Sequence, residues 1–140
     1  MANQGYNWNA QDYAKNSQNQ FQWAQELIPK LKLRGNETLL DIGCGDGKIT
    51  AELARRLPEG RVVGVDSSKE MIQLARRNFP AEPHLNLSFQ VMDARRLTFN
   101  GEFDIAFSNA ALHWIVDQLN VLNSVKRSLK PHGRLLFNQP

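Results

Sequence analysis

The sequence predicts an α/β fold: a doubly wound, mainly parallel sheet of five strands in the order 3-2-1-4-5, with helices on both faces. Two observations predict it. Short apolar runs alternate with segments whose apolar residues recur every three or four positions, as in repeated strand–helix–strand units. Glycine, serine and acidic residues follow these runs, as at the carboxyl ends of parallel strands, where such sheets bind ligands. Right-handed crossovers then fix most of the topology.

Length and composition place the chain among ordinary globular domains. It has 140 residues, of which 41% are hydrophobic and 22% charged, and a chain of this size can build one sizeable core. A single cysteine excludes an internal disulfide, so we expect a reducing, cytoplasmic location. The polar amino terminus lacks the apolar region of a secretion signal, and no apolar run is long enough to span a bilayer, so we expect no membrane partner.

The basic residues do not gather into one block. The net charge is +3 and the pI is about 9.2, but the arginine and lysine pairs lie far apart among apolar residues. This spacing is typical of solvated helix faces rather than of a nucleic-acid-binding patch, so we expect no nucleic-acid partner.

We divide the chain into residues 1–35, an N-terminal helical cap segment, and residues 36–140, a ligand-binding domain. Pro29 lies near the end of the predicted helix and is expected to bend or shorten it. The apolar stripe of that helix recurs at spacings of three and four: Phe21, Ala24, Leu27, Ile28 and Leu31.

The first half of the domain reads strand, helix, strand, helix. We expect buried parallel strands over residues 38–42 and 61–65. A helix between them ends before Pro58, and Ser67 or Ser68 can cap the next one. The expected apolar faces are Ile49, Leu53 and Leu57 for the first helix and Met71, Ile72, Ala75 and Phe79 for the second.

The second half continues the alternation. We expect strands over residues 85–92, 103–107 and 135–137. Before the last strand, Asp117 can cap a helix that Pro131 and Gly133 end. The expected apolar face of this helix is Leu119, Leu122, Val125 and Leu129.

The sequence stops shortly after the fifth predicted strand. The fifth strand would then be an apolar edge, which proteins usually cover. A second copy of the chain, forming a homo-oligomer, is one cover that we expect.

Residues 41–47, which read DIGCGDG, form the first candidate binding element. A dinucleotide fingerprint has the spacing G-x-G-x-x-G, but Lys48 stands here in place of the third glycine. Asp41 before the first glycine disfavours pyrophosphate and favours a cationic group, while a helix N-terminus accepts a carboxylate. A zwitterionic amino-acid tail satisfies both, and a glycine-rich turn without a ligand is the alternative.

Two acidic residues follow the next two predicted strands. Asp66 stands about where an acid accepts both hydroxyls of a ribose, and a serine cap on the following helix would free it for this role. Asp93 could accept the exocyclic amine of an adenine, with the Ala94 amide contacting a ring nitrogen. The alternative for Asp93 is a turn aspartate.

His113 follows the fourth predicted strand. It can act as a base or as a donor to a substrate carboxylate, or it can have only a structural role. Cys44 is expected to be a small apolar filler of its loop, because no histidine lies near it in sequence to act as a base. We expect no metal site.

Together these stretches resemble the class I S-adenosylmethionine-dependent methyltransferases. The resemblance extends over about residues 36 to 138, and SNAALHW with the aromatic-rich N-terminus is most similar to the trans-aconitate methyltransferase branch of small-molecule carboxyl O-methyltransferases. The matching stretches are DIGCGDG (41–47), GVDSSKEMIQLAR (64–76), VMDA (91–94), FDIAFSNAALHW (103–114) and LKPHGRLLF (129–137).

The resemblance implies a Rossmann-like fold, S-adenosylmethionine as cofactor and S-adenosylhomocysteine as product. Members of this family usually continue past the fifth strand with a helix and an antiparallel hairpin, so the resemblance also implies that the C-terminal hairpin strands are absent here and that the domain of residues 36–140 is truncated at its C-terminus. Its implied site residues, position by position, are as follows. Asp41, Gly43 and Gly45 would line the methionine part, with Cys44 between them; Asp66 would hold the ribose; Ser67 and Met71 would lie near the adenine; Asp93 and Ala94 would contact its edge; Asn109 would lie beside the sulfonium; and Tyr13 and Gln18 could close over the cofactor.

The expected function is therefore methyl transfer by in-line displacement to a small-molecule acceptor, such as a carboxylate oxygen. The alternative is a cofactor-binding module without turnover of its own. A nucleic-acid methyltransferase is disfavoured because residues 109–112 read NAAL rather than the Asn/Asp-Pro-Pro-aromatic motif of enzymes that methylate base amines. Lys48 and the absence of a second mononucleotide half disfavour a nicotinamide-dependent dehydrogenase.

Overall fold

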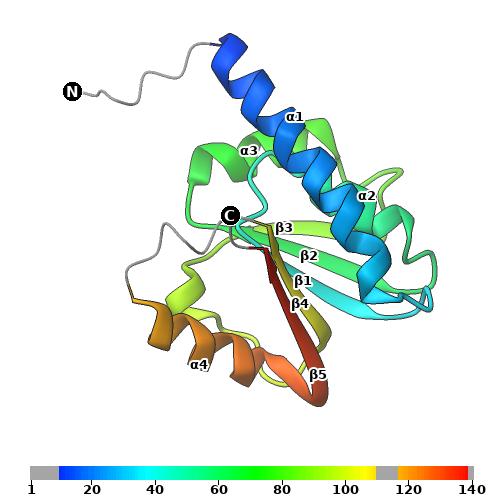
Figure 1. Ribbon diagram of the computed structural model, residues 1–140, viewed down its shortest axis with the longest axis vertical. Helices are drawn as coiled ribbons and strands as arrows, with labels where there is room; N and C mark the ends of the chain where they lie inside the picture. The colour runs from blue at the N-terminus through cyan, green and yellow to red at the C-terminus, as the bar shows by residue number, and fades with distance from the viewer. Residues whose placement is uncertain (1–9, 110–116, 139–140) are drawn as a thin grey trace.

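The computed structural model describes residues 10–109 and 117–138 and contains the predicted sheet. Its five strands have the order β3-β2-β1-β4-β5, and every neighbouring pair is parallel. Figure 1 shows the strands side by side in this order. The α/β fold class and the strand order are therefore confirmed. The strands are β1 Thr38–Ile42, β2 Arg61–Asp66, β3 Leu87–Val91, β4 Phe103–Asn109 and β5 Leu129–Asn138.

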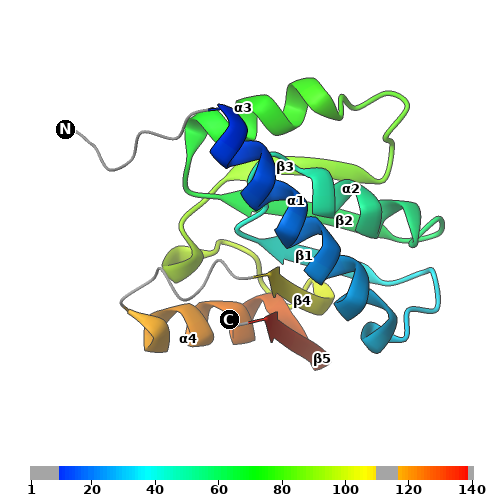
Figure 2. The same ribbon diagram turned by 45° about the horizontal axis from the view of Figure 1, so that its top comes forward.

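Helices cover both faces of the sheet, as predicted. α1, α2 and α3 lie on one face, and α4 lies on the other with the short helix η3 (Figure 2). No helix in the described ranges is both long enough and apolar enough to cross a membrane. The helices are α1 Ala10–Leu27, the 3-10 helix η2 Ile28–Leu31, α2 Lys48–Arg55, α3 Lys69–Asn78, the 3-10 helix η3 Ala94–Arg96 and α4 Gln118–Ser128.

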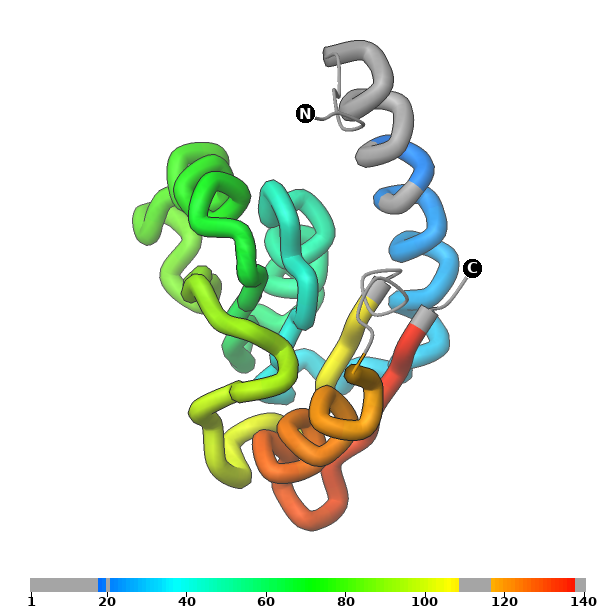
Figure 3. Tube along the Cα trace, turned by 90° about the vertical axis from the view of Figure 1, so that its left-hand side faces the viewer, coloured from blue at the N-terminus to red at the C-terminus, as the bar shows by residue number. Residues whose placement is uncertain are grey.

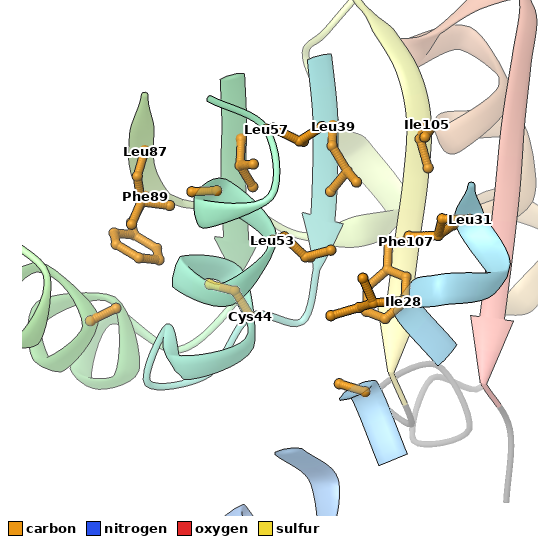
Figure 4. Packing of buried hydrophobic residues seen from close by; sticks show 14 of the residues in the cluster. Ile28, Leu31, Leu39, Cys44, Leu53, Leu57, Leu87, Phe89, Ile105 and Phe107 are labelled. Atoms are coloured by element: carbon orange, nitrogen blue, oxygen red, sulfur yellow. The ribbon is translucent and has the colours of Figure 1, made fainter. Parts of the chain in front are cut away.

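The side chains of each strand alternate between two cores. On β1, Leu39 contributes to the core under α1, α2 and α3, whereas Leu40 and Ile42 contribute to the core under α4. Figure 4 shows the first core, in which Phe107 of β4 lies beside Ile28 of η2. Because both faces of the central strands are covered, these strands are near-continuous apolar runs, as parallel sheets require.

The end of α1 is set by Pro29. The α-helix stops at Leu27, and the chain continues as η2 with the proline in its first turn. This confirms that Pro29 shortens the helix. Figure 3 shows α1 near β4 and β5, at the opposite end of the same face from α3.

Two predicted apolar patterns were wrong. Leu85, expected on the third strand, precedes β3 and is 82% exposed, because β3 begins only at Leu87. On α4, Leu119 and Leu122 are 70% and 42% exposed. The buried face of α4 instead contains Val121, Ser124, Val125 and Ser128.

Hydrogen bonds explain why serines rather than leucines face inward on α4. The Ser124 hydroxyl accepts a 2.7 Å bond from the Leu97 backbone N–H, and the Ser128 hydroxyl donates a 2.9 Å bond to the Ser124 carbonyl. Both buried hydroxyls are thereby satisfied, which removes the cost of burying them.

The fifth strand begins earlier than predicted. β5 starts at Leu129 and includes Pro131 and Gly133, which we expected to lie before it. The register with β4 shifts between Phe103 and Ile105, so that several β5 residues lie opposite a single residue of β4. A proline is tolerated in β5 because this strand is at the edge of the sheet.

Candidate functional site

The glycine loop, residues 43–47, connects the carboxyl end of β1 to α2. Its backbone is hydrogen-bonded to the end of β2. Gly43 and Cys44 donate their N–H groups to the Val65 carbonyl at 2.8 and 2.9 Å, and Gly45 donates to Oδ2 of Asp66 at 2.9 Å. Three hydrogen bonds therefore join the loop to the end of β2 at the carboxyl edge of the sheet.

All three glycines of the loop adopt positive φ. The angles are 76° for Gly43, 55° for Gly45 and 87° for Gly47, which most other residues adopt only with strain. A Cβ at Gly47 would also lie 2.8 Å from Cζ of Phe89, whereas one at Gly45 would meet only the Met71 methyl at 3.7 Å. The glycines therefore allow the sharp backbone turn between β1 and α2.

Asp41 lies buried beneath this loop. Its Oδ2 accepts a 2.7 Å hydrogen bond from the Thr50 hydroxyl of α2, and no described residue donates a hydrogen bond to Oδ1. Burial raises the pKa of Asp41 to about 7, against the lowering effect of the Thr50 bond, and the negative charge of Asp66 raises it further. A buried carboxylate with one oxygen unused can receive a cationic donor.

Asp66 ends β2 and holds two backbone groups. Oδ2 accepts the Gly45 N–H and Oδ1 accepts the Ser68 N–H, each at 2.9 Å. Ser68 caps α3 through a bond from Met71 N, as the sequence predicted, so Asp66 does not have to. A carboxylate has about four acceptor positions, so two remain for other donors.

Asp93 has the local role that the sequence left open as its alternative. It caps η3 by accepting the Arg95 N–H at 2.8 Å and forms an ion pair with the Arg95 guanidinium, also at 2.8 Å. These hydrogen bonds from Arg95 lower the pKa of Asp93 to about 2. Ala94 beside it is buried. Contact of either residue with an adenine stays a prediction.

The remaining predicted residues divide into three groups: those that are buried or half-buried, those that are exposed, and those outside the described residues. Met71 lies half-buried near Gly45, and Cys44 is buried with its thiol pKa raised, first by desolvation and then by the charges of Asp41 and Asp66. Ser67 on the α3 side and Gln18 on α1 are exposed. His113 lies outside the described residues, as do the side chains of Tyr13 and Asn109, whose backbones belong to α1 and to the end of β4.

Two residues that support the site were missed at the sequence level. Thr50 is the hydrogen-bond partner of Asp41, and Gly64 on β2 provides the space beneath the loop. A Cβ at Gly64 would lie 3.0 Å from Cβ of Cys44 and 3.0 Å from Cγ2 of Thr50. The signal was a glycine inside the apolar strand RVVGV, since such a glycine often marks a close approach of other groups.

The electrostatics of the loop fit a cationic ligand. The pKa of the Cys44 thiol is raised mainly by desolvation and further by the charges of Asp41, Asp66 and Asp46, so three acidic side chains lie close to the loop. Pyrophosphate would be repelled there. The sulfonium and ammonium groups of S-adenosylmethionine would be attracted, and its ribose could use the remaining acceptor positions of Asp66. The residues present therefore fit this cofactor.

Comparison with known proteins agrees with this fit. Residues 39–133 match the family model described as a methyltransferase domain. The chain is 35% identical over 133 residues to a trans-aconitate 2-methyltransferase of Azoarcus sp. (strain BH72), covering 95% of this chain and 51% of the relative. The chain thus spans about half the length of the curated relatives it matches.

Solved structures share the fold. The YcgJ protein of Bacillus subtilis has a TM-score of 0.74 and 30% identity, over 81% of this chain and 48% of that one. Phosphoethanolamine N-methyltransferase 2 of Haemonchus contortus, solved with S-adenosyl-L-methionine, has a TM-score of 0.77 and 26% identity, over 83% of this chain and 27% of that one. The chain therefore belongs to the class I S-adenosylmethionine-dependent methyltransferases.

Proposed function

We propose that the chain binds S-adenosylmethionine at the carboxyl edge of β1 and β2 and transfers its methyl group to a small-molecule acceptor, with a carboxylate oxygen as the first candidate. The observation that carries the proposal is Asp41, a buried carboxylate beneath a glycine loop with one oxygen unused by the described residues. Leaving a buried carboxylate oxygen without a donor costs free energy, which an incoming ammonium group would recover.

The residues of this chain would bind and orient the cofactor. Asp41 and the loop amides would hold the methionine part, Asp66 would accept the ribose hydroxyls, and Met71 would pack near the adenine. The proposal gives the other candidates these roles: Gly43, Gly45 and Cys44 as loop backbone, Ser67, Asp93 and Ala94 around the adenine, Asn109 beside the sulfonium, and Tyr13 and Gln18 over the cofactor.

The chemistry asks little more of the protein. The cofactor supplies an activated methyl group on a sulfonium, so the chain has mainly to position the acceptor in line and to exclude water. A carboxylate acceptor is already a nucleophile at neutral pH and needs no base. An alcohol or amine acceptor would need one, and His113 is the residue we propose for it. The carboxylate acceptor is favoured by the likeness to trans-aconitate 2-methyltransferases.

Isothermal titration with S-adenosylhomocysteine tests cofactor binding directly. We expect saturable heat with micromolar affinity, and its absence at high ligand concentration in folded protein would overturn the proposal. Transfer of labelled methyl groups to a panel of small polycarboxylates then tests turnover. Binding without transfer to any acid, alcohol or amine would favour the alternative, a cofactor-binding module.

A further inference from the structure

A basic groove opens at the amino ends of β1, β4 and β5. It has a volume of about 800 Å³ and is lined mainly by polar residues. Four cationic side chains and two carboxylates line it: Lys32, Arg34, Lys130, Arg134, Glu37 and Asp104. The volume is within the range of small-molecule sites, and the groove has an excess of positive charge.

Both carboxylates of the groove are already hydrogen-bonded to the backbone. Glu37 accepts the N–H groups of Arg34 and Gly35, each at 2.9 Å. Asp104 accepts the Thr38 N–H at 2.8 Å and pairs with the Lys130 ammonium at 3.1 Å. Backbone N–H groups and Lys130 therefore occupy these two carboxylates. The side chains of Lys32, Arg34 and Arg134 have no carboxylate partner among the described residues.

The cations of the groove differ in how they are held. Arg134 donates a hydrogen bond to the Leu31 carbonyl at 2.6 Å, which fixes its guanidinium. The Lys32 and Arg34 side chains form no hydrogen bond or ion pair with any residue in the described ranges. The backbone of Lys32 is nevertheless fixed in a left-handed conformation, with φ 51°, by its N–H bond to the Pro29 carbonyl. Two uncommitted cations are thus presented from an ordered segment.

We propose that this groove binds a small multivalent oxyanion, with Arg34 and Lys32 as its main partners. An arginine guanidinium can grip such a group through two parallel hydrogen bonds. A nucleic acid is disfavoured because its phosphates need a long stripe of cations rather than one short concave site. The groove lies at the opposite end of the strands from the glycine loop, roughly 15–20 Å away at about 3.3 Å per strand residue, so an anion there is not the methyl acceptor.

The test uses the full chain and two probes, inorganic pyrophosphate and citrate, followed by ¹H–¹⁵N NMR titration. We expect saturable shifts of the backbone signals of residues 32–37 and 129–134. Preference for pyrophosphate would assign the ligand as a phosphate compound, and preference for citrate would assign it as a polycarboxylate. Arg34→Gln should weaken the binding about tenfold, the loss expected for one charge-assisted contact. Adding Lys32→Gln to Arg34→Gln should weaken the binding further.

A matched control removes the same charge elsewhere. Arg77→Gln on exposed α3 should leave the affinity unchanged, and because the Arg34 side chain has no described partner, its substitution should not alter the fold. Equal losses in Arg77→Gln and Arg34→Gln would overturn the proposal, as would shifts confined to residues 43–47 or no shifts at millimolar probe. Tighter binding of RNA or DNA with steep salt dependence would also overturn it in favour of a nucleic-acid surface.

Discussion

The backbone N–H of Gly45 donates a 2.9 Å hydrogen bond to Oδ2 of Asp66, which joins the glycine loop after β1 to the end of β2. The acid that we assign to the ribose is thus also a structural support of the loop that we assign to the methionine part. Both ends of the proposed cofactor site are therefore set in place before any ligand binds, which lowers the conformational cost of binding.

Asp66→Ala should weaken S-adenosylhomocysteine binding strongly. The substitution removes both ribose acceptors and also frees the N–H groups of Gly45 and Ser68. We expect a loss of at least about 2 kcal/mol, or roughly thirtyfold in affinity by isothermal titration.

Ser68→Ala is a control for Asp66→Ala, because it disturbs the start of α3 without changing the Asp66 side chain. It removes the cap of α3 but leaves the Asp66 carboxylate in place. We expect about 1 kcal/mol less stability and nearly unchanged affinity. If Ser68→Ala reduced the affinity as much as Asp66→Ala does, the ribose assignment would be wrong.

Thr50→Val should destabilise the protein more at high pH than at low pH. The change keeps the side-chain shape but leaves the buried Asp41 without its described hydrogen bond. The ionised acid suffers most, so we expect a loss of about 1–3 kcal/mol at about pH 8 and less at about pH 5. Denaturant unfolding at both values measures it, with the exposed Thr98→Val as control. Equal losses at both pH values would contradict the bond's role.

Asp41 should make stability fall as the pH rises. Its pKa is about 7 in the fold against an ordinary value of 3.8, so between these values the folded state holds a proton that the unfolded chain has released. The unfolding free energy should therefore decrease from about pH 4 to about pH 7, by at most about 4 kcal/mol, and then level off.

Asp41→Asn isolates this contribution. The amide cannot ionise but can still accept the Thr50 hydroxyl, so the decline that Asp41 causes from about pH 4 to about pH 7 should be absent from the variant's stability curve and should appear in the difference between parent and variant. Other carboxylates remain the same in both proteins. Parallel stability curves for variant and parent would show that Asp41 titrates normally in the fold.

Gly64→Ala should lower the free energy of unfolding, because the added methyl group would crowd the residues beneath the glycine loop. The new methyl group would lie 2.9 Å from the Phe89 ring and 3.0 Å from both Cys44 and Thr50. Overpacking of this kind costs about 1–3 kcal/mol. Thermal or denaturant unfolding measures it against Ser88→Ala, an exposed change on β3, for which we expect no effect beyond about 0.5 kcal/mol. Equal stabilities of the two variants would contradict the close packing at Gly64.

The strands that end in glycine or acid were predictable from the sequence because their apolar runs are buried on both faces. β1 has the predicted bounds, 38–42, since Gly43 ends the run. The face of α4 was not predictable from apolar spacing, because Ser124 finds its partner in Leu97, which is distant in sequence. The start of β5 was missed because an edge strand tolerates Pro131.

The candidate site was predictable where strand ends determine it. Asp41, Asp66 and the glycine loop came together as expected, because the carboxyl ends of β1 and β2 are neighbours. The pairing of Asp93 with Arg95 is a local contact that the sequence allowed but did not require. Thr50 and Gly64 were missed because their importance depends on what packs against them in three dimensions.

Cys44 gives this chain a built-in reporter. It is the one cysteine of the 140 residues, and its side chain is 7% exposed within the glycine loop, with its thiol pKa raised mainly by desolvation. A thiol reagent should therefore react only during moments when the loop opens. The labelling rate then reports how often the loop around Cys44 opens. A bound cofactor should slow this labelling.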